Sequence, residues 1–202
     1  MNPVFEVTKY LLPRDTHYCP GCSHGVAHRI LMEVLEERGE IGDTIGVSPV
    51  GCSITAHSYL DVDLIESPHG RAPAVATGIK RVHPNAPVFT YQGDGDLASI
   101  GGNELLHVAE RGEKITIIFI NNAIYGMTGG QMAPTTLLGQ KATTCPDGRS
   151  IDVQGAPMKM AEIMSTFERA VYVERCALDS PASIRKAKKA LDRAFEVQKR
   201  GL

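Results

Sequence analysis

Three short apolar runs without alternation constrain the fold of this 202-residue chain most strongly. They lie at residues 44–47, 87–91 and 114–120, and segments with helical periodicity separate them. Strands that are apolar on both sides are typical of a parallel sheet that helices cover on both faces. The order of the segments therefore predicts an α/β fold with a mainly parallel sheet and helices on both of its faces.

The predicted helices have recognisable start and stop residues. Gly39 and Gly112 follow segments with apolar residues at helical spacing, and Ser180 with Pro181 is typical of a helix start. A further apolar run at 170–174 predicts a fourth strand. The predicted helices span residues 24–38, 72–82, 103–111, 158–167 and 180–199. We find no repeat or linker, so we expect a single domain over residues 1–202. Within it, residues 125–150 form a long loop of the kind that is usually functional or mobile.

Composition excludes several classes of protein. A net charge of -2 provides no basic field for nucleic acid or an anionic membrane. No stretch approaches the roughly 18 apolar residues of a membrane-spanning helix. Residues 1–14 carry Glu6, Lys9 and Arg14 and so do not resemble a signal peptide. We therefore expect a cytoplasmic protein, in which the odd count of five cysteines favours metal binding, redox chemistry or burial over disulfides.

Two polar motifs follow neighbouring predicted strands. Gly-Asp-Gly-Asp occupies 93–96 and Asn-Asn occupies 121–122, so Asp94 and Asn122 should meet at one edge of the sheet, where ligands bind in such folds. Carboxylate and amide oxygens suit Mg²⁺, which proteins often share with phosphates. Glycines and a helix N-terminus favour a bound anion. The pattern predicts a Mg²⁺–diphosphate site, although Gly-Asp-Gly alone is more often a plain turn.

The cysteines form a second motif. Cys19 and Cys22 have the spacing with which two thiolates bind zinc or an iron–sulfur cluster, and a redox dithiol is the alternative. Cys52 follows the strand at 44–47 and should open onto the same edge, although a lone cysteine is more often a small buried apolar residue. We interpret Cys145 and Cys176 as thiols that bind no metal.

The sequences of residues 91–101 and 121–132 resemble those of one family closely. Tyr-Gln-Gly-Asp-Gly-Asp-Leu-Ala-Ser-Ile-Gly and Asn-Asn-Ala-Ile-Tyr-Gly-Met-Thr-Gly-Gly-Gln-Met are similar to the thiamine diphosphate motif in β subunits of 2-oxoacid:ferredoxin oxidoreductases. The resemblance implies a thiamine diphosphate-binding fold with thiamine diphosphate, Mg²⁺ and a [4Fe–4S] cluster. It implies coenzyme A-dependent oxidative decarboxylation of a 2-oxoacid, with electrons passed through the cluster to ferredoxin. The text fits the 2-oxoglutarate and branched-chain (2-ketoisovalerate) types.

The resemblance also implies site residues. Asp94 and Asn122, with the backbone carbonyl of Ile124, would hold Mg²⁺, and Cys19, Cys22 and Cys52 match three of the four cluster ligands. The other residues expected at the cofactor are Val50, Gly51, Ser53, His69, Gly70, Arg71, Gly93, Gly95, Asp96, Gly126 and Met127, with Cys52 again among them. For His69 and Arg71 a buried hydrogen-bonded histidine and an ion pair are the alternatives.

The sequence departs from the family at two places. The fourth cysteine of the family lies after the last helix, usually beyond another strand, so the resemblance implies a C-terminally incomplete domain or a different fourth ligand. Ser23 stands where the family commonly has Gly, and its small size should be tolerated.

The resemblance assigns the activating glutamate of thiamine enzymes to a partner α subunit, with γ and δ subunits as further candidate partners. We therefore assign no catalytic role to Glu104, Glu110 or Glu113, which we interpret as a solvated helix face and its end. Two alternatives remain open. A thiamine-dependent decarboxylase without redox chemistry leaves the three cysteines unexplained, and a non-catalytic zinc-binding module leaves the Gly-Asp-Gly and Asn-Asn motifs unexplained.

Overall fold

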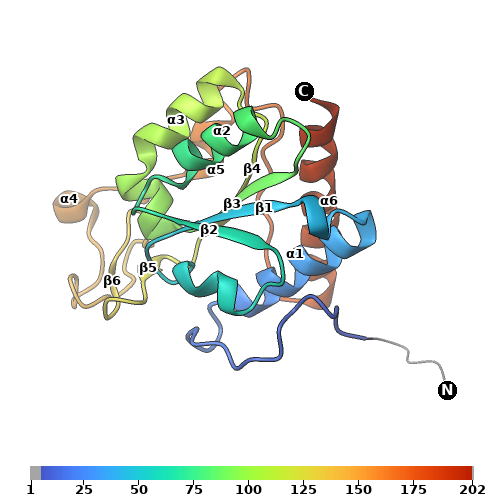
Figure 1. Ribbon diagram of the computed structural model, residues 1–202. Coiled ribbons are helices and arrows are strands. Elements are labelled where there is room, and N and C mark those ends of the chain that lie inside the picture. The colour runs from blue at the N-terminus through green and yellow to red at the C-terminus, as the bar shows by residue number, and fades with distance from the viewer. Residues whose placement is uncertain (1–5, 202) are drawn as a thin grey trace.

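Four parallel strands form the central sheet of the protein, for which a computed structural model describes residues 6–201 (Figure 1). The strands are β1 (Ile45–Pro49), β2 (Asp63–Ser67), β3 (Val88–Gly93) and β4 (Thr116–Ile120), and their order in the sheet is β2-β1-β3-β4. The predicted α/β fold with a parallel sheet is confirmed. The first five residues of the segment 1–14 lie outside the described residues.

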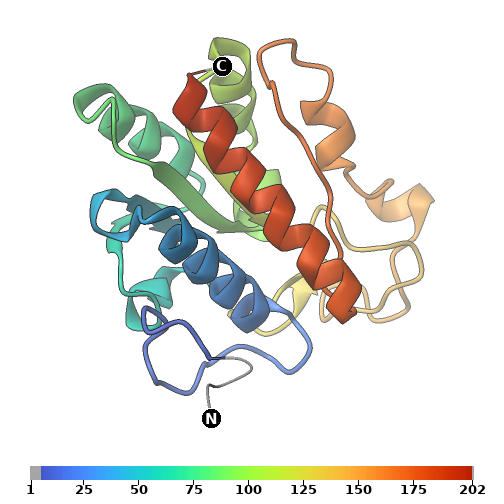
Figure 2. The same ribbon diagram turned by 90° about the vertical axis from the view of Figure 1, so that its right-hand side faces the viewer.

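Helices cover both faces of this sheet. On one face α1 (His24–Arg38) and α6 (Pro181–Arg200) lie side by side, as Figure 2 shows. On the other face lie α2 (Ala72–Val82), α3 (Gly102–Arg111) and the short α5 (Met160–Met164) (Figure 1). Short helical segments, η1 (Ile41–Asp43), η2 (Ile54–Ser58) and the π-helical η3 (Asp96–Ile100), connect these elements.

The lack of alternation in the strand sequences follows from this two-sided cover. Side chains of a strand point to opposite faces in turn. In β4, Ile118 and Ile120 pack toward α1 and α6, whereas Ile117 and Phe119 pack against α3 and α5. Both faces therefore need apolar residues.

The predicted helix ends agree closely with the structure. Gly39 adopts a left-handed conformation (φ 66°), and its N–H bonds to carbonyls of the last turn of α1. The Ser180 hydroxyl accepts a hydrogen bond from the Ser183 N–H, and Pro181 is the first residue of α6. Both ends depend on residues within a few positions, which is why the sequence predicts them well.

Three predictions of secondary structure need correction. Residues 170–174 are not a strand, because they belong to an extended segment without strand pairing among the described residues. The predicted helix at 158–167 is reduced to α5. The sequence analysis missed β2, since its Asp-Leu-Ile-Glu-Ser sequence is polar at the edge of the sheet.

The long loop contains regular pieces. Strands β5 (Ile124–Tyr125) and β6 (Gln131–Met132) form an antiparallel pair, and α4 (Ile151–Gln154) follows the loop. Within residues 6–201, no helix has the length and apolar character needed to cross a membrane.

Candidate cofactor site

Asp94 lies directly after β3, and its side chain is held from three sides. The residue is 1% exposed. Oδ1 accepts a hydrogen bond from the Gly95 N–H (2.8 Å), while Oδ2 accepts from the Ala123 N–H (2.6 Å) and the Thr135 hydroxyl (2.5 Å). Burial raises the pKa of the Asp94 carboxyl, and these hydrogen bonds oppose that rise. The carboxylate therefore has one fixed orientation at the carboxyl edge of the sheet.

Asn122 and Ile124 bring two further polar groups to this carboxylate. One terminal atom of the Asn122 amide lies 3.1 Å from the Ile124 carbonyl oxygen and 3.2 Å from Asp94 Oδ1. A nitrogen there donates two hydrogen bonds, whereas an oxygen there makes a cluster of three oxygens. Mg²⁺ binds oxygens octahedrally at about 2.0–2.1 Å, which places neighbouring ligand oxygens about 3 Å apart. The donor set fits a Mg²⁺ ion.

The backbone at Ala123, between Asn122 and Ile124, is strained. Its φ of 64° is left-handed, which costs a residue with a Cβ about 1–2 kcal/mol. The Thr136 hydroxyl donates to the Ala123 carbonyl at 2.6 Å and holds the turn in place. Strain of this kind is concentrated at functional sites. Here the strained turn brings the Asn122 amide close to the Ile124 carbonyl and to Asp94.

Sequence reasoning missed the residues that support this site from the long loop. Arg149 is buried, and its guanidinium donates to the carbonyls of Pro134 (2.8 Å) and Thr136 (2.7 Å), among others. It thereby fixes the segment that presents Thr135 to Asp94. No periodicity or spacing in the sequence connects Arg149 with Asp94, so only the fold reveals it.

Gly95 is a glycine because an aromatic ring lies against it. A Cβ at this position would lie 2.3 Å from the Tyr125 ring. The Tyr125 hydroxyl donates to the Gly95 carbonyl at 2.8 Å, so the ring is fixed there. This contact joins the turn after β3 to β5.

Asp96 connects the turn after β3 to residues 69–71. Its Oδ1 accepts from the Gly70 N–H (2.6 Å) and contacts His69 Nδ1, and its Oδ2 accepts from Gln92 (2.5 Å). The carboxylate is therefore occupied by protein partners. His69 is thus hydrogen-bonded, as its alternative interpretation has it, but its side chain is 30% exposed and is therefore only partly buried.

Arg71 forms an ion pair with Glu104 (2.6 Å), which agrees with its alternative interpretation. The interpretation of the glutamates is wrong in part. The side chain of Glu104 is only 19% exposed, and Glu113 pairs with Arg81 and Arg111. Glu110 is exposed, as expected. Apolar periodicity alone gave no sign of these pairs, since their partners come from other elements or from the end of α3.

The three predicted cluster cysteines line one cleft of about 1430 Å³. Cys52 lies beside Gly126, and the Met127 N–H bonds to its thiol. Burial raises the pKa of the Cys52 thiol, and the neighbouring thiols of Cys19 and Cys22 raise it further. Among the other expected site residues, Asn122, Ile124, Gly126 and Met127 line the same cleft. The remaining expected residues do not line it: Val50, Gly51, Ser53, His69, Gly70, Arg71, Gly93, Asp94, Gly95 and Asp96.

The thiols do not form a metal-binding group in this structure. Among residues 6–201, no three or more His, Cys, Asp or Glu side chains form a group ready to hold a metal ion. Cys19 is exposed and Cys22 is partly exposed. Cys176 also lines the cleft, whereas Cys145 is buried elsewhere with its thiol on the Gln140 carbonyl.

Ser23 explains the glycine preference at its position. Its φ of 66° is left-handed and its side chain makes no capping hydrogen bond. The expectation that a small side chain is tolerated here considered only size. The backbone conformation is the relevant property, because it favours glycine.

A buried cluster of rings lies behind the cysteine turn. The Tyr18 ring stacks on His24 (4.3 Å between centroids), and His24 Nδ1 hydrogen-bonds to the Tyr91 hydroxyl (2.8 Å). His28 packs against Tyr91 at 4.8 Å. Burial lowers the pKa of His24 to about 4 and that of His28 to about 3, so both are neutral near pH 7. The cluster connects the cysteine turn to β3, the strand that leads into Asp94.

Comparison with known proteins agrees with this geometry. The family profile described as "Thiamine pyrophosphate enzyme, C-terminal TPP binding domain" matches residues 45–201, a range that includes Asp94 and Asn122. The chain belongs to the thiamine pyrophosphate enzymes. The predicted thiamine diphosphate-binding fold is confirmed.

Individual relatives show which kinds of thiamine pyrophosphate enzyme this chain resembles. The chain is 48% identical over 201 residues to ketoisovalerate oxidoreductase subunit VorA of Methanothermobacter marburgensis. This match covers 100% of this chain and 42% of the length of that protein. It is 42% identical over 178 residues to 2-oxoglutarate synthase subunit KorB of Methanocaldococcus jannaschii, with 87% and 64% covered. The chain thus spans less than two thirds of the length of these relatives.

A solved structure supports the same resemblance. The chain matches the 2-oxoglutarate:ferredoxin oxidoreductase from Magnetococcus marinus with a TM-score of 0.79 at 29% identity, over 93% of this chain and 62% of that one. The predicted resemblance to the thiamine diphosphate-binding subunits of 2-oxoacid:ferredoxin oxidoreductases is confirmed.

Proposed function

We propose that this chain is the cofactor-binding subunit of a 2-oxoacid:ferredoxin oxidoreductase. The observation that carries the proposal is a single cleft lined both by Asn122 and Ile124, two of the three expected Mg²⁺ ligands, and by the three cysteines Cys19, Cys22 and Cys52. Oxygen ligands suit a hard cation and thiolates suit an iron–sulfur cluster. The solved relative holds 2-oxoglutarate, coenzyme A and succinyl-CoA, which fits coenzyme A-dependent oxidative decarboxylation.

We assign Mg²⁺ to Asp94, Asn122 and the Ile124 carbonyl. The support is their mutual spacing and the fixed orientation of Asp94. Bound thiamine diphosphate supplies the nucleophile and the electron sink for decarboxylation. Gly95, Gly126 and Met127 line the diphosphate in this assignment, and Asp96 holds the turn at 69–71 in place. The remaining cofactor-binding residues of the proposal are Val50, Gly51, Cys52, Ser53, His69, Gly70, Arg71 and Gly93.

We assign a [4Fe–4S] cluster to Cys19, Cys22 and Cys52, with a fourth ligand outside this set. Two of these thiols lie on the turn before α1, and Cys52 lies against Gly126 and Met127. Cluster and thiamine diphosphate are therefore neighbours in this proposal, which suits transfer of electrons from one to the other and on to ferredoxin.

The partners are an α subunit, with γ and δ subunits as further candidates, and ferredoxin. An activating glutamate is expected from the α subunit. Within this chain Glu104 and Glu113 are paired with arginines, which leaves neither free for that role. The chain contributes one cofactor-binding domain to the complex. The higher identity to the ketoisovalerate subunit favours a branched-chain 2-oxoacid over 2-oxoglutarate as the substrate.

Anaerobic purification of the native complex tests the proposal. We expect bound iron, sulfide and thiamine diphosphate, and reduction of a viologen that requires both coenzyme A and a 2-oxoacid. A screen of 3-methyl-2-oxobutanoate, 2-oxoglutarate and pyruvate identifies the substrate. Aldehyde formation without iron would instead establish a non-redox decarboxylase. Zinc without thiamine diphosphate would establish the non-catalytic module.

A further inference from the structure

The two halves of α6 differ in how they carry charge. The first half, residues 181–191, contains no acidic residue and four basic ones: Arg185, Lys186, Lys188 and Lys189. The second half contains residues of both signs, and Asp192 and Glu196 there form ion pairs with Arg38 of α1. Positive charge is therefore concentrated in the half of the helix that begins at Pro181.

Within residues 6–201, the protein neutralises one of these four cations. Lys188 Nζ lies 2.9 Å from a carboxylate oxygen of Glu33 and 2.7 Å from one of Glu37, both on α1. The other three basic residues of the first half are exposed, and none of them forms an ion pair in the described part of the chain.

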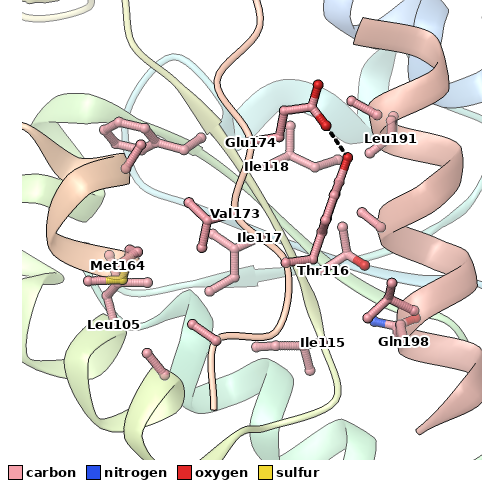
Figure 3. Close-up of a pocket in the computed structure, with 18 of the residues that line it drawn as sticks. Leu105, Ile115, Thr116, Ile117, Ile118, Met164, Val173, Glu174, Leu191 and Gln198 are labelled. Carbon is pink, nitrogen blue, oxygen red and sulfur yellow. Dashed lines mark hydrogen bonds between the residues drawn. The ribbon is translucent and has the colours of Figure 1, made fainter. Parts of the chain in front are cut away.

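These three cations share one outward face of α6 with a fourth. The four residues, called the basic stripe below, are Arg185, Lys186, Lys189 and Arg193. Side chains three or four residues apart lie on the same side of a helix. The inner side of α6 is used for packing: in Figure 3, Leu191 and Gln198 line a mainly apolar cavity of about 380 Å³ beside Ile118 of β4. The basic stripe is left at the surface.

Helix stability does not account for the basic stripe. The first turn of a helix favours acidic residues, and like charges four residues apart on a helix repel each other. Arg193 gains one favourable contact, since its guanidinium lies 5.5 Å from the centroid of the Tyr172 ring. Folding offers the other three cations no such compensation.

The basic stripe lies near the cysteine end of the molecule. Helices α1 and α6 lie side by side, as Figure 2 shows, and they run in the same direction, because Glu33 pairs with Lys188 and Arg38 pairs further along with Asp192. Helix α1 begins two residues after Cys22. Residues 177–178, just before α6, line the same cleft as the three cysteines. At 1.5 Å per residue, the stripe begins roughly 6 Å along the axis from the start of α6.

We propose that the basic stripe docks the electron acceptor of the reaction, a ferredoxin that presents a face rich in carboxylates. The inference rests on the proposed function, because one electron at a time must leave a reduced cluster in this cleft and enter the oxidised iron–sulfur centre of the acceptor. Attraction between faces of opposite charge speeds the encounter and orients the partners more than it adds affinity. Such docking suits a carrier that must leave after each transfer, and redox encounters of this kind need only a small contact area.

Charge reversal in the native complex tests the proposal. In the Arg185→Glu/Lys189→Glu double variant, the KM for ferredoxin at low salt should rise at least about tenfold, since steering by opposite charges is lost. Reduction of methyl viologen should be retained, because a small dication needs no docking by a carboxylate-rich face. In the unmodified complex, added salt should raise the ferredoxin KM in the same direction.

A matched pair of single variants sharpens the test. Lys189→Glu should raise the ferredoxin KM, whereas Lys114→Glu should not, because Lys114 is exposed just before β4 at the opposite end of the sheet. If charge reversal abolishes both activities, the milder Arg185→Gln/Lys189→Gln variant takes its place.

The outcomes separate this inference from the proposed function. An unchanged ferredoxin KM in either double variant overturns the docking surface while viologen reduction still supports the proposed function. A variant complex that dissociates into subunits also overturns it, because the stripe would then bind a partner subunit. An unmodified complex that reduces neither acceptor with coenzyme A and a 2-oxoacid refutes the proposed function, and the inference with it.

Discussion

Asn122 and Ile124, two of the proposed Mg²⁺ ligands, share one cleft with the three thiols, but the protein holds the oxygen groups and the thiols in place to different degrees. Asp94 is fixed by three hydrogen bonds, and Asn122 and Ile124 already lie at the spacing of metal ligands. Cys19 lies exposed on a turn before α1. The ends of two paired strands supply the first group, whereas loops supply the second. In the proposed assignment, the difference makes the Mg²⁺ site rigid and leaves the cluster site to close when its cluster binds.

Removal of one thiol should have the largest effect. If the cluster holds the turn at 19–22 in place, Cys19→Ser should abolish nearly all bound iron in the anaerobically purified protein, because too few thiolates remain to hold a cluster. Binding of thiamine diphosphate with Mg²⁺ should change little. Iron and sulfide analysis, with calorimetry for the diphosphate, measures both.

Cys145→Ala is the matched control, since Cys145 is buried away from the cleft. It should keep its iron. A Cys19→Ser protein with full iron content would mean that the turn does not carry a cluster ligand.

Asp94→Asn should have the next largest effect, on the oxygen site alone. The substitution keeps the size of the side chain but removes its charge and one acceptor. Affinity for thiamine diphosphate with Mg²⁺ should fall at least about 100-fold, at the upper end of what outer-sphere changes cost. Iron content should stay unchanged. Asp147→Asn, at an exposed position, is the control. Equal affinity of the Asp94→Asn protein would remove Asp94 from the site.

These two variants also show what the sequence could and could not predict. Asp94 and Asn122 were predictable because ends of parallel strands meet at one edge, a rule that needs only the order of elements. Thr135 and Arg149 were not, because an irregular loop brings them to Asp94 and no periodicity records its path. The helix caps at Gly39 and Ser180 were predictable because they are local.

The two misjudged strands have one physical cause. Residues 170–174 have the composition of a strand, but pairing depends on a neighbour that local sequence does not reveal. β2 pairs although its sequence is polar, because only part of an edge strand is buried. In both cases, position in the sheet overrides local propensity.

Acidification should destabilise the ring cluster behind the thiols more than the oxygen site. In the folded protein His24 and His28 have pKa values of about 4 and about 3, against about 6.5 for an ordinary histidine. The unfolded chain therefore binds more protons as the pH falls below 6.5. Stability should be fully present above pH 6.5 and fall toward pH 4, by up to about 1.4 kcal/mol per pH unit for each histidine. Urea unfolding at several pH values measures this slope.

His28→Asn should reduce that slope, and His107→Asn, at an exposed position, should leave it unchanged. A stability that is flat between pH 6.5 and pH 5 would show that the two rings are not held neutral by burial.

The smallest effect on stability should come from relieving the backbone strain at Ser23, next to the cysteine turn. Ser23→Gly should stabilise the protein by about 1 kcal/mol, because glycine adopts the left-handed conformation of this position without a steric cost. Ser165→Gly is the control: Ser165 has a φ of -68°, so glycine there should be neutral or destabilising. Thermal unfolding measures both. If the turn at 19–22 closes only around a cluster, the gain from Ser23→Gly should be present in the iron-free protein as well, since residue 23 is already left-handed before closure. A gain that appeared only with bound iron would mean that the strain at Ser23 arises when the turn closes. It would contradict the inference that residue 23 is already left-handed before a cluster binds.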